Sequence, residues 1–156
     1  MSLIEQYIIA MAHLYGAFEI EDLIDLYNTH NEASIDKETI HAIPDLEARL
    51  EKHYIYFVDE MFISQAVLPD DFFTELMDEK MGRPTYIPDN EELLKYQDEA
   101  YFNPSEVLDE WIRFIRKYGN EKALLFFDDV LLSSCMALKM GWDAEETLMD
   151  LERSQY

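Results

Sequence analysis

Histidine, cysteine and carboxylate side chains could ligate a metal, so their spacing is the first chemistry to consider. The histidines are His13, His30, His41 and His53, and their separations of 17, 11 and 12 residues match no metal-binding motif. Glu38 and His41 form a single Glu-x-x-His pair, whereas a di-metal helix bundle needs two such pairs. Cys135 stands alone, which excludes a zinc site built on thiolates. We therefore expect no metal and no cofactor.

Covalent catalysis would need a nucleophile beside a general base. Ser133, Ser134 and Cys135 are consecutive, but no histidine is near them in the sequence. The glycines stand at positions 16, 82, 119 and 141, too far apart for a Gly-rich phosphate-binding loop. We therefore expect a protein that is not an enzyme, with Cys135 as a buried, unreactive thiol in an apolar run.

The charge of the chain restricts its partners. Its 156 residues include 34 Asp and Glu but only 12 Lys and Arg, which gives a formal net charge of -22. Residues 1–66 hold 13 acids and 3 bases, and residues 67–156 hold 21 acids and 9 bases. Because both halves repel phosphates, we expect neither nucleic acid nor a membrane surface as a partner. Three roles of the acids stay open: solubility alone, attraction of a basic protein, or mimicry of a nucleic acid to inhibit a DNA-acting enzyme.

The periodicity of apolar residues predicts a mainly α fold that begins with a winged-helix-like part. Apolar residues recur at helical spacing over residues 3–15 and 19–30 and in a third helix that Ser34 or Asp36 caps and that reaches residue 50. Pro44 either kinks this third helix or begins a new one. Tyr54–Val58 and Met61–Ser64 are β-rich runs that predict a hairpin. The intervening Asp59-Glu60 is not the favoured Asn-Gly, so a looser turn stays open. Three helices and a β-hairpin outline a winged-helix-like unit over residues 1–66.

A winged helix raises the hypothesis of a transcriptional regulator, which the charge of its third helix opposes. From Asp36 to His53 there are five acids and three bases. A helix of net negative charge in the major groove would be repelled by the phosphates. By fold-level analogy, winged helices without a basic face commonly serve as packing or protein-interaction modules.

The rest of the chain is expected to be a helix and extended linker over residues 67–88, then a helical bundle over residues 89–156 packed on the first part. Pro69 begins the first of these helices, and prolines 84 and 88 keep the linker extended. Asp89, Asn103-Pro104, Ala123 and Asp143 mark four further helix starts. We expect Tyr86 and Ile87 to be buried against both halves, so that Tyr86→Ala costs about 3–4 kcal/mol.

One group of residues in this half is a candidate for binding, and a second group, which is basic, has a structural explanation. Arg83, Tyr86, Tyr96 and Tyr101 combine arginine with aromatic side chains, the types most common at protein-interaction hot spots. The alternative is that these tyrosines dock the second half onto the first. The basic cluster of Arg113, Arg116 and Lys117 follows Glu106, Asp109 and Glu110 on the same helix, an order that suits the helix dipole and spaced ion pairs.

A resemblance to a known group rests on the region around the linker. Two stretches, Arg83-Pro84-Thr85-Tyr86-Ile87-Pro88 and then Glu91-Glu92-Leu93-Leu94-Lys95-Tyr96-Gln97-Asp98-Glu99-Ala100-Tyr101-Phe102, resemble uncharacterised Firmicute proteins related to the N-terminal region of SEC-C-motif-containing proteins. Tyr15-Gly16, Leu23, Tyr27-Asn28 and Asn31 are similar to the N-terminal part of the same group. This chain lacks the SEC-C cysteines, so the resemblance implies no zinc, and it implies no known activity.

Compartment and partners follow from these features. Residues 7–18 are almost all apolar but are preceded by no basic residue, and no run reaches the ~20 apolar residues of a membrane span. We expect a cytoplasmic protein with an unidentified protein partner, and a homo-oligomer stays open. The leading hypothesis is a non-enzymatic protein-interaction or adaptor module.

Overall fold

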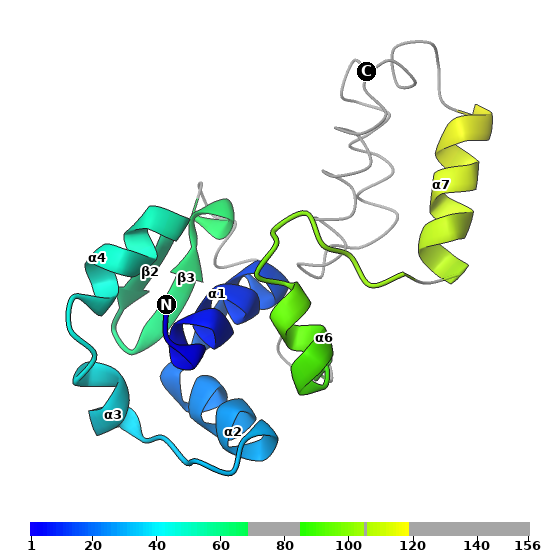
Figure 1. Cartoon of the computed structure of the whole chain (residues 1–156). Coiled ribbons are helices and arrows are strands. Elements are labelled where there is room, and N and C mark those ends of the chain that lie inside the picture. Colours follow the sequence, from blue (N-terminus) through cyan, green and yellow to red (C-terminus); the bar gives the residue numbers. More distant parts are fainter. Residues whose placement is uncertain (69–84, 105, 119–156) are drawn as a thin grey trace. The chain divides into compact units, whose positions relative to one another are not determined.

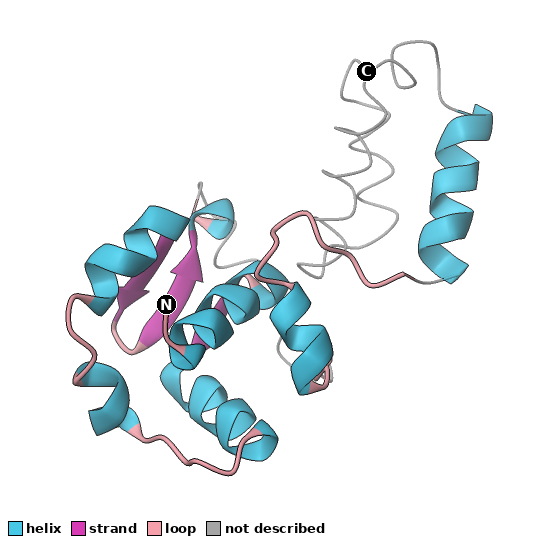
Figure 2. Cartoon of the chain, viewed as in Figure 1, coloured by secondary structure: helices cyan, strands magenta, loops and turns pink. Residues whose placement is uncertain are grey.

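The chain divides into two compact units, Met1–Tyr101 and Phe102–Tyr156. A computed structural model describes residues 1–68, 85–104 and 106–118, whose helices and strands are shown in Figure 1. These residues are rich in helix and contain a three-stranded antiparallel sheet (Figure 2), in agreement with the expected mainly α fold. The division places residues 89–101 in the first unit, whereas the sequence placed them in a C-terminal bundle.

Helix α1 (Leu3–Tyr15) is the central element of the first unit, and the helix expected over residues 3–15 is confirmed. It begins with a capping box, in which the Ser2 hydroxyl accepts the Glu5 N–H and the Glu5 carboxylate accepts the Ser2 N–H. Gly16 ends it at φ 75° and ψ −51°, a conformation that a Cβ atom strongly disfavours. Every side chain from Tyr7 to Ala12 is buried, so α1 needs neighbours on several sides.

The sheet covers part of α1 and has the strand order β1-β3-β2. Its strands are β1 (Ala17–Glu19), β2 (Ile55–Val58) and β3 (Met61–Ser64), and η2 (Gln65–Val67) follows. The predicted hairpin of β2 and β3 is confirmed. Phe62 is paired with Phe18 on one side and Phe57 on the other, with ring centroids 5.2 and 4.4 Å apart. Strand β1 was not predicted, because a strand of three residues between two helices is too short to show alternation.

The hairpin turn is tight, although it contains no glycine. Asp59 and Glu60 both adopt the left-handed conformation, at φ 49° and 65°, as a type I′ turn requires. Glu60 is held by the neighbouring helices: its carbonyl accepts the Ile20 N–H at 2.9 Å, and its carboxylate pairs with Lys37 at 3.3 Å and with His41 at 3.2 Å. These contacts offset the cost of the left-handed backbone.

The third predicted helix is divided into two short ones. Helix α2 (Ile20–His30) is followed by α3 (Lys37–His41), α4 (Leu46–Leu50) and η1 (Glu51–His53). Pro44 lies between α3 and α4, and the next residue, Asp45, is left-handed at φ 53°. Pro44 therefore neither kinks a continuous helix nor begins a new one. It separates two helices that bury Ile40, Leu46 and Leu50.

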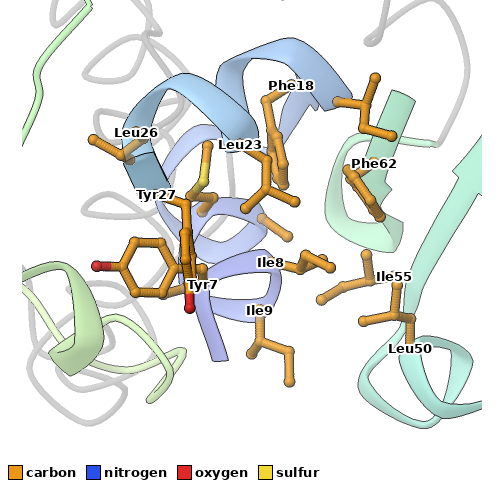
Figure 3. Packing of buried hydrophobic residues seen from close by; sticks show 14 of the residues in the cluster. Tyr7, Ile8, Ile9, Phe18, Leu23, Leu26, Tyr27, Leu50, Ile55 and Phe62 are labelled. Atoms are coloured by element: carbon orange, nitrogen blue, oxygen red, sulfur yellow. The ribbon is translucent and has the colours of Figure 1, made fainter. Parts of the chain in front are cut away.

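Helix α6 (Asn90–Lys95) completes the first unit by packing along α1. Its start at Asp89 is as predicted, with the carboxylate accepting the Glu92 N–H at 2.9 Å. Figure 3 shows Tyr7 and Tyr27 on one side of α1 and Leu50, Ile55 and Phe62 on the other, all within a single cluster of buried residues. Leu93 and Tyr96 extend this cluster into α6.

The described part of the second unit contains α7 (Glu106–Tyr118), close to the start predicted at Asn103-Pro104. The helices predicted from Pro69, Ala123 and Asp143 lie outside the described residues, as does Cys135. Within the described residues, no helix is both long enough and apolar enough to span a membrane.

Replacing Gly16 with Ala is expected to lower the free energy of unfolding by about 1–2 kcal/mol, because the new Cβ clashes at φ 75°. Urea denaturation followed by circular dichroism measures this change. Asp45→Gly is the matched control at another positive φ, where relief of strain offsets the added chain entropy and stability should stay nearly constant. Equal stability of Gly16→Ala and the wild type would contradict the assignment.

Candidate protein-interaction surface

Two side chains of α1 hold the segment that was predicted to bind a partner. The Tyr15 hydroxyl donates to the Tyr86 carbonyl at 2.8 Å, and His13 Nδ1 lies 2.9 Å from the Tyr96 carbonyl. Because a carbonyl oxygen can only accept, the His13 proton must be on Nδ1. The segment is therefore fixed to α1 both before α6 and at its C-terminal end.

Tyr86 is exposed but restrained. Its carbonyl accepts the Tyr15 hydroxyl, and its own hydroxyl donates to Glu92 Oε2 at 2.7 Å. Tyr86 nevertheless keeps 51% of its surface exposed, and the adjacent Ile87 keeps 65%. A partner that contacts this pair would find the tyrosine already ordered, which reduces the entropy lost on binding. We refer to Tyr86 and Ile87 as the Tyr86–Ile87 surface.

The residues that follow the Tyr86–Ile87 surface in the sequence are acidic. Asp89 and Glu91 are exposed, and Glu92 accepts the Tyr86 hydroxyl. Lys95 approaches Glu91 at 3.8 Å, a spacing that gives little stabilisation between exposed groups. An apolar and aromatic centre with carboxylates beside it suits a partner segment that carries apolar and basic side chains.

The tyrosine hydroxyls that anchor this region are held protonated. Burial raises the pKa of Tyr15, and the nearby Asp22 carboxylate raises it further. Burial also raises the pKa of Tyr7. Both phenols therefore stay hydrogen-bond donors at neutral and moderately alkaline pH.

The four predicted binding residues have different positions. Tyr86 is exposed, Tyr101 is half-buried, and Tyr96 is buried with 4% of its surface exposed. Tyr96 and Tyr101 pack edge to face with ring centroids 4.9 Å apart, so their contact lies within the first unit. Arg83 lies outside the described residues. Of this set, Tyr86 offers the most exposed ring.

The expected burial of Tyr86 and Ile87 is wrong. Both side chains are more than half exposed, and Pro88 is the buried residue of this segment. The prolines did indicate that the segment is not helical, but an extended backbone does not determine which side chains face the core. The expected cost of 3–4 kcal/mol for Tyr86→Ala must therefore be reduced.

A partly buried polar network, which sequence reasoning missed, joins α1 to the end of α2 and to α6. The Tyr7 hydroxyl donates to Asn90 Oδ1 at 2.8 Å, accepts from Asn31 Nδ2 at 3.0 Å and lies 3.2 Å from His30 Nδ1. Because the phenol gives its one proton to Asn90, His30 must donate from Nδ1. His30 is thus placed to orient the Tyr7 hydroxyl.

Residues that carry the resemblance of the N-terminal part have structural roles here. Asn28 holds Ile35 through two hydrogen bonds, accepting its N–H at 2.7 Å and donating to its carbonyl at 3.0 Å. Asn31 Nδ2 donates to the Tyr27 carbonyl at 2.9 Å, which satisfies the last turn of α2. The spacing of Tyr27, Asn28 and Asn31 was visible in the sequence, but their contacts with distant residues were not.

The basic side chains of the α3–α4 segment are largely paired within the unit. Lys37 pairs with Glu21 and Glu60, and Arg49 Nε lies 3.2 Å from Glu5 Oε1. Lys52 is the remaining base of this segment and has no ion pair among the described residues. Two of the three basic side chains of this segment that could contact a phosphate backbone are therefore already paired with carboxylates.

These ion pairs shift the pKa values of their members. Burial by itself would raise the pKa of Glu5, but the Ser2 hydrogen bonds and the Arg49 charge outweigh it, so the pKa lies below its ordinary 4.5. The hydrogen bond between Lys37 and Glu21 raises the pKa of the lysine and lowers that of the carboxyl. All three groups are therefore charged at neutral pH.

Metal chemistry has no visible basis in this part of the chain. Over residues 1–68, 85–104 and 106–118, no three His, Cys, Asp or Glu side chains gather closely enough to hold an ion. Comparison of the chain with protein-family models, curated proteins and solved structures finds no match. The relation to the Firmicute proteins stays a prediction, and function must be inferred from geometry.

Replacing Glu5 with Gln is expected to destabilise the protein at pH 7 by about 1–2 kcal/mol, because the Arg49 contact and part of the helix cap are lost. Since the folded-state pKa of Glu5 is lowered, its stabilising effect is present above the ordinary pKa of 4.5 and is lost as the pH falls through the folded value. The difference between wild type and Glu5→Gln in denaturant titrations should therefore shrink below pH 4.5. A difference that grows on acidification would contradict this account.

Replacing Tyr86 with Ala is expected to cost only about 1 kcal/mol, the scale of its hydroxyl hydrogen bond and partial packing. Tyr7→Ala should cost about 3–5 kcal/mol, because that ring is fully buried and its hydroxyl joins three side chains. Thermal and chemical denaturation of both variants gives the comparison. Similar losses for the two would show that Tyr86 is a core residue after all.

Proposed function

We propose that this chain is a non-enzymatic protein-interaction module that binds its partner at the Tyr86–Ile87 surface. The observation that carries the proposal is the exposed aromatic and aliphatic pair, fixed by hydrogen bonds to Tyr15 and Glu92. Exposed aromatic side chains that are already ordered are typical of interaction hot spots. The restraint on Tyr86 comes from α1 and α6, so the first unit supplies the scaffold and the extended segment before α6 supplies the contact.

The chemistry of the surface indicates the kind of partner. The exposed carboxylates of Asp89 and Glu91 adjoin the apolar pair in sequence, and the whole chain carries a net charge of -22. Long-range attraction therefore favours a basic protein, and the Tyr86–Ile87 contact would provide specificity. The partner we propose is a protein segment with apolar and basic residues.

The element order supports the winged-helix-like interpretation of residues 1–66. The order α1-β1-α2-α3-α4-β2-β3, with β3 between the other two strands, is a helical part followed by a hairpin. In this interpretation α3 and α4, which Pro44 divides, would stand for the recognition helix, and Lys37 and Arg49 there are already paired with carboxylates. A protein-binding role is therefore favoured over reading of the major groove.

A transcriptional regulator is the second candidate, favoured by element order alone. It predicts a band shift with genomic DNA fragments at low salt, and absence of a shift would remove it. The nucleic-acid-mimic hypothesis and the cytoplasmic location stay predictions.

The interaction proposal predicts that immobilised wild-type protein retains a basic protein from a cell lysate. Ile87→Asp should reduce this retention at least about 10-fold, because a charge is placed in an apolar contact. Val58→Asp is the matched control, since Val58 is similarly exposed but lies on the hairpin. Tyr15→Phe tests the restraint on Tyr86 and should weaken binding without altering the surface itself. Equal retention by Ile87→Asp and Val58→Asp would overturn the assignment of the surface.

A further inference from the structure

Helix α7 carries an aromatic stripe in which Trp111 is half-buried and the other two rings are exposed to solvent. Trp111, Phe114 and Tyr118 lie on one face of the helix, with successive ring centroids 5.6 and 4.9 Å apart. Phe114 is 45% exposed and Tyr118 is 63% exposed. Such a row of rings on a helix is typical of a helix that packs against another helix.

A stripe of charged residues runs beside the rings on the same helix. Glu106, Glu110, Arg113 and Lys117 follow one another at intervals of four, three and four residues, and all four are exposed. The N-terminal half of this stripe is acidic and the C-terminal half is basic. We refer to these four residues as the charged stripe of α7.

Within a single helix the charged stripe has one favourable spacing, Glu110 with Arg113, and two unfavourable ones. Glu106 with Glu110 and Arg113 with Lys117 are like-charged pairs four residues apart, which repel each other. The ion pairs expected along this helix are not formed by Arg113 or Lys117 among the described residues. Arg113 Nε donates to the Asp109 carbonyl at 3.2 Å, and Lys117 Nζ lies 5.0 Å from the centre of the Tyr118 ring. The helix dipole explains why the acidic residues lie at the N-terminal end of α7. It does not explain why acidic and basic residues share one face of the helix, or why the aromatic rings beside them are exposed.

We propose that α7 pairs antiparallel with α7 of a second copy of this chain. A two-fold axis between positions 111 and 112 brings Glu106 opposite Lys117 of the second copy and Glu110 opposite Arg113. The acidic half of the charged stripe on one copy then faces the basic half on the other copy. A parallel pair would instead place acidic residues beside acidic ones and basic residues beside basic ones. Packed helices lie about 8–10 Å apart, close enough for flanking side chains to form ion pairs.

The exposed rings supply the apolar contact of this pair. The aromatic stripe lies directly beside the charged stripe, as the core positions of paired helices lie beside the charged positions that select their partner. A nucleic acid strand could also stack on these rings, but the acidic half of the charged stripe would repel its phosphates. A second copy of the chain is therefore the better occupant. This proposal goes beyond the proposed partner binding and does not use the Tyr86–Ile87 surface.

Sedimentation of the full chain tests the pairing. The wild type should approach twice its mass of 18.5 kDa as its concentration rises. Lys117→Glu and Glu106→Lys should each raise the dissociation constant about 10-fold, because each replaces two attractions by two repulsions. An equimolar mixture of these two variants should recover the dimer, since every opposed pair is again of opposite charge. Recovery also shows that neither variant has simply unfolded.

A cross-link tests the orientation. In a Cys135→Ser background, a chain with both Glu106→Cys and Lys117→Cys should form a covalent dimer on mild oxidation, whereas Glu106→Cys alone should not. The two positions are 11 residues apart on one helix, roughly 16 Å, so they cannot form a disulfide within one chain. A wild type that stays monomeric at every concentration reached, a mixture that fails to recover the dimer, or a cross-link through Glu106→Cys alone would overturn the proposal.

Discussion

The burial of α1 on nearly every side is the constraint on which the first unit depends. Six consecutive side chains, from Tyr7 to Ala12, are removed from solvent, so α2, the sheet and α6 must all cover the same helix. Polar groups on such a helix need partners, because an unpaired buried polar group is costly. Glu5 meets Arg49, and the Tyr7 hydroxyl meets Asn31 and Asn90. The polar residues of α1 thereby determine where α4, the end of α2 and α6 can lie.

Local patterns predicted the elements better than they predicted the contacts. The first helix, the hairpin and α7 were found because apolar periodicity and helix-capping residues act within a few positions of the chain. Pro44 indicated an interruption of the third helix. The separation of α3 from α4, however, depends on the burial of Ile40 and Leu46 in the core. The exposure of Tyr86 could not be predicted, since it depends on Tyr15, 71 positions away.

The chain has few basic side chains, and most of those in the α3–α4 segment form ion pairs with carboxylates of other elements. Lys37 and Arg49 are engaged by carboxylates of other elements, so they stabilise the contacts of α3 and α4. Among the described residues, the basic end of α7 is the place where cations gather on an exposed face without a carboxylate partner for Arg113 or Lys117. An exposed basic face on a strongly acidic protein is consistent with a contact to a macromolecule of complementary charge.

The left-handed turn at Asp59 and Glu60 also bears on the order in which the protein folds. A two-residue turn without glycine is unfavourable in an isolated hairpin, and here it is stabilised by Ile20 and Lys37. Ile20 and Glu60 are separated by 40 positions, so this stabilisation is gained only after a long loop has closed. We therefore expect the hairpin to become stable only after α2 and α3 have docked on it, so that long-range contacts rather than the turn itself favour its formation.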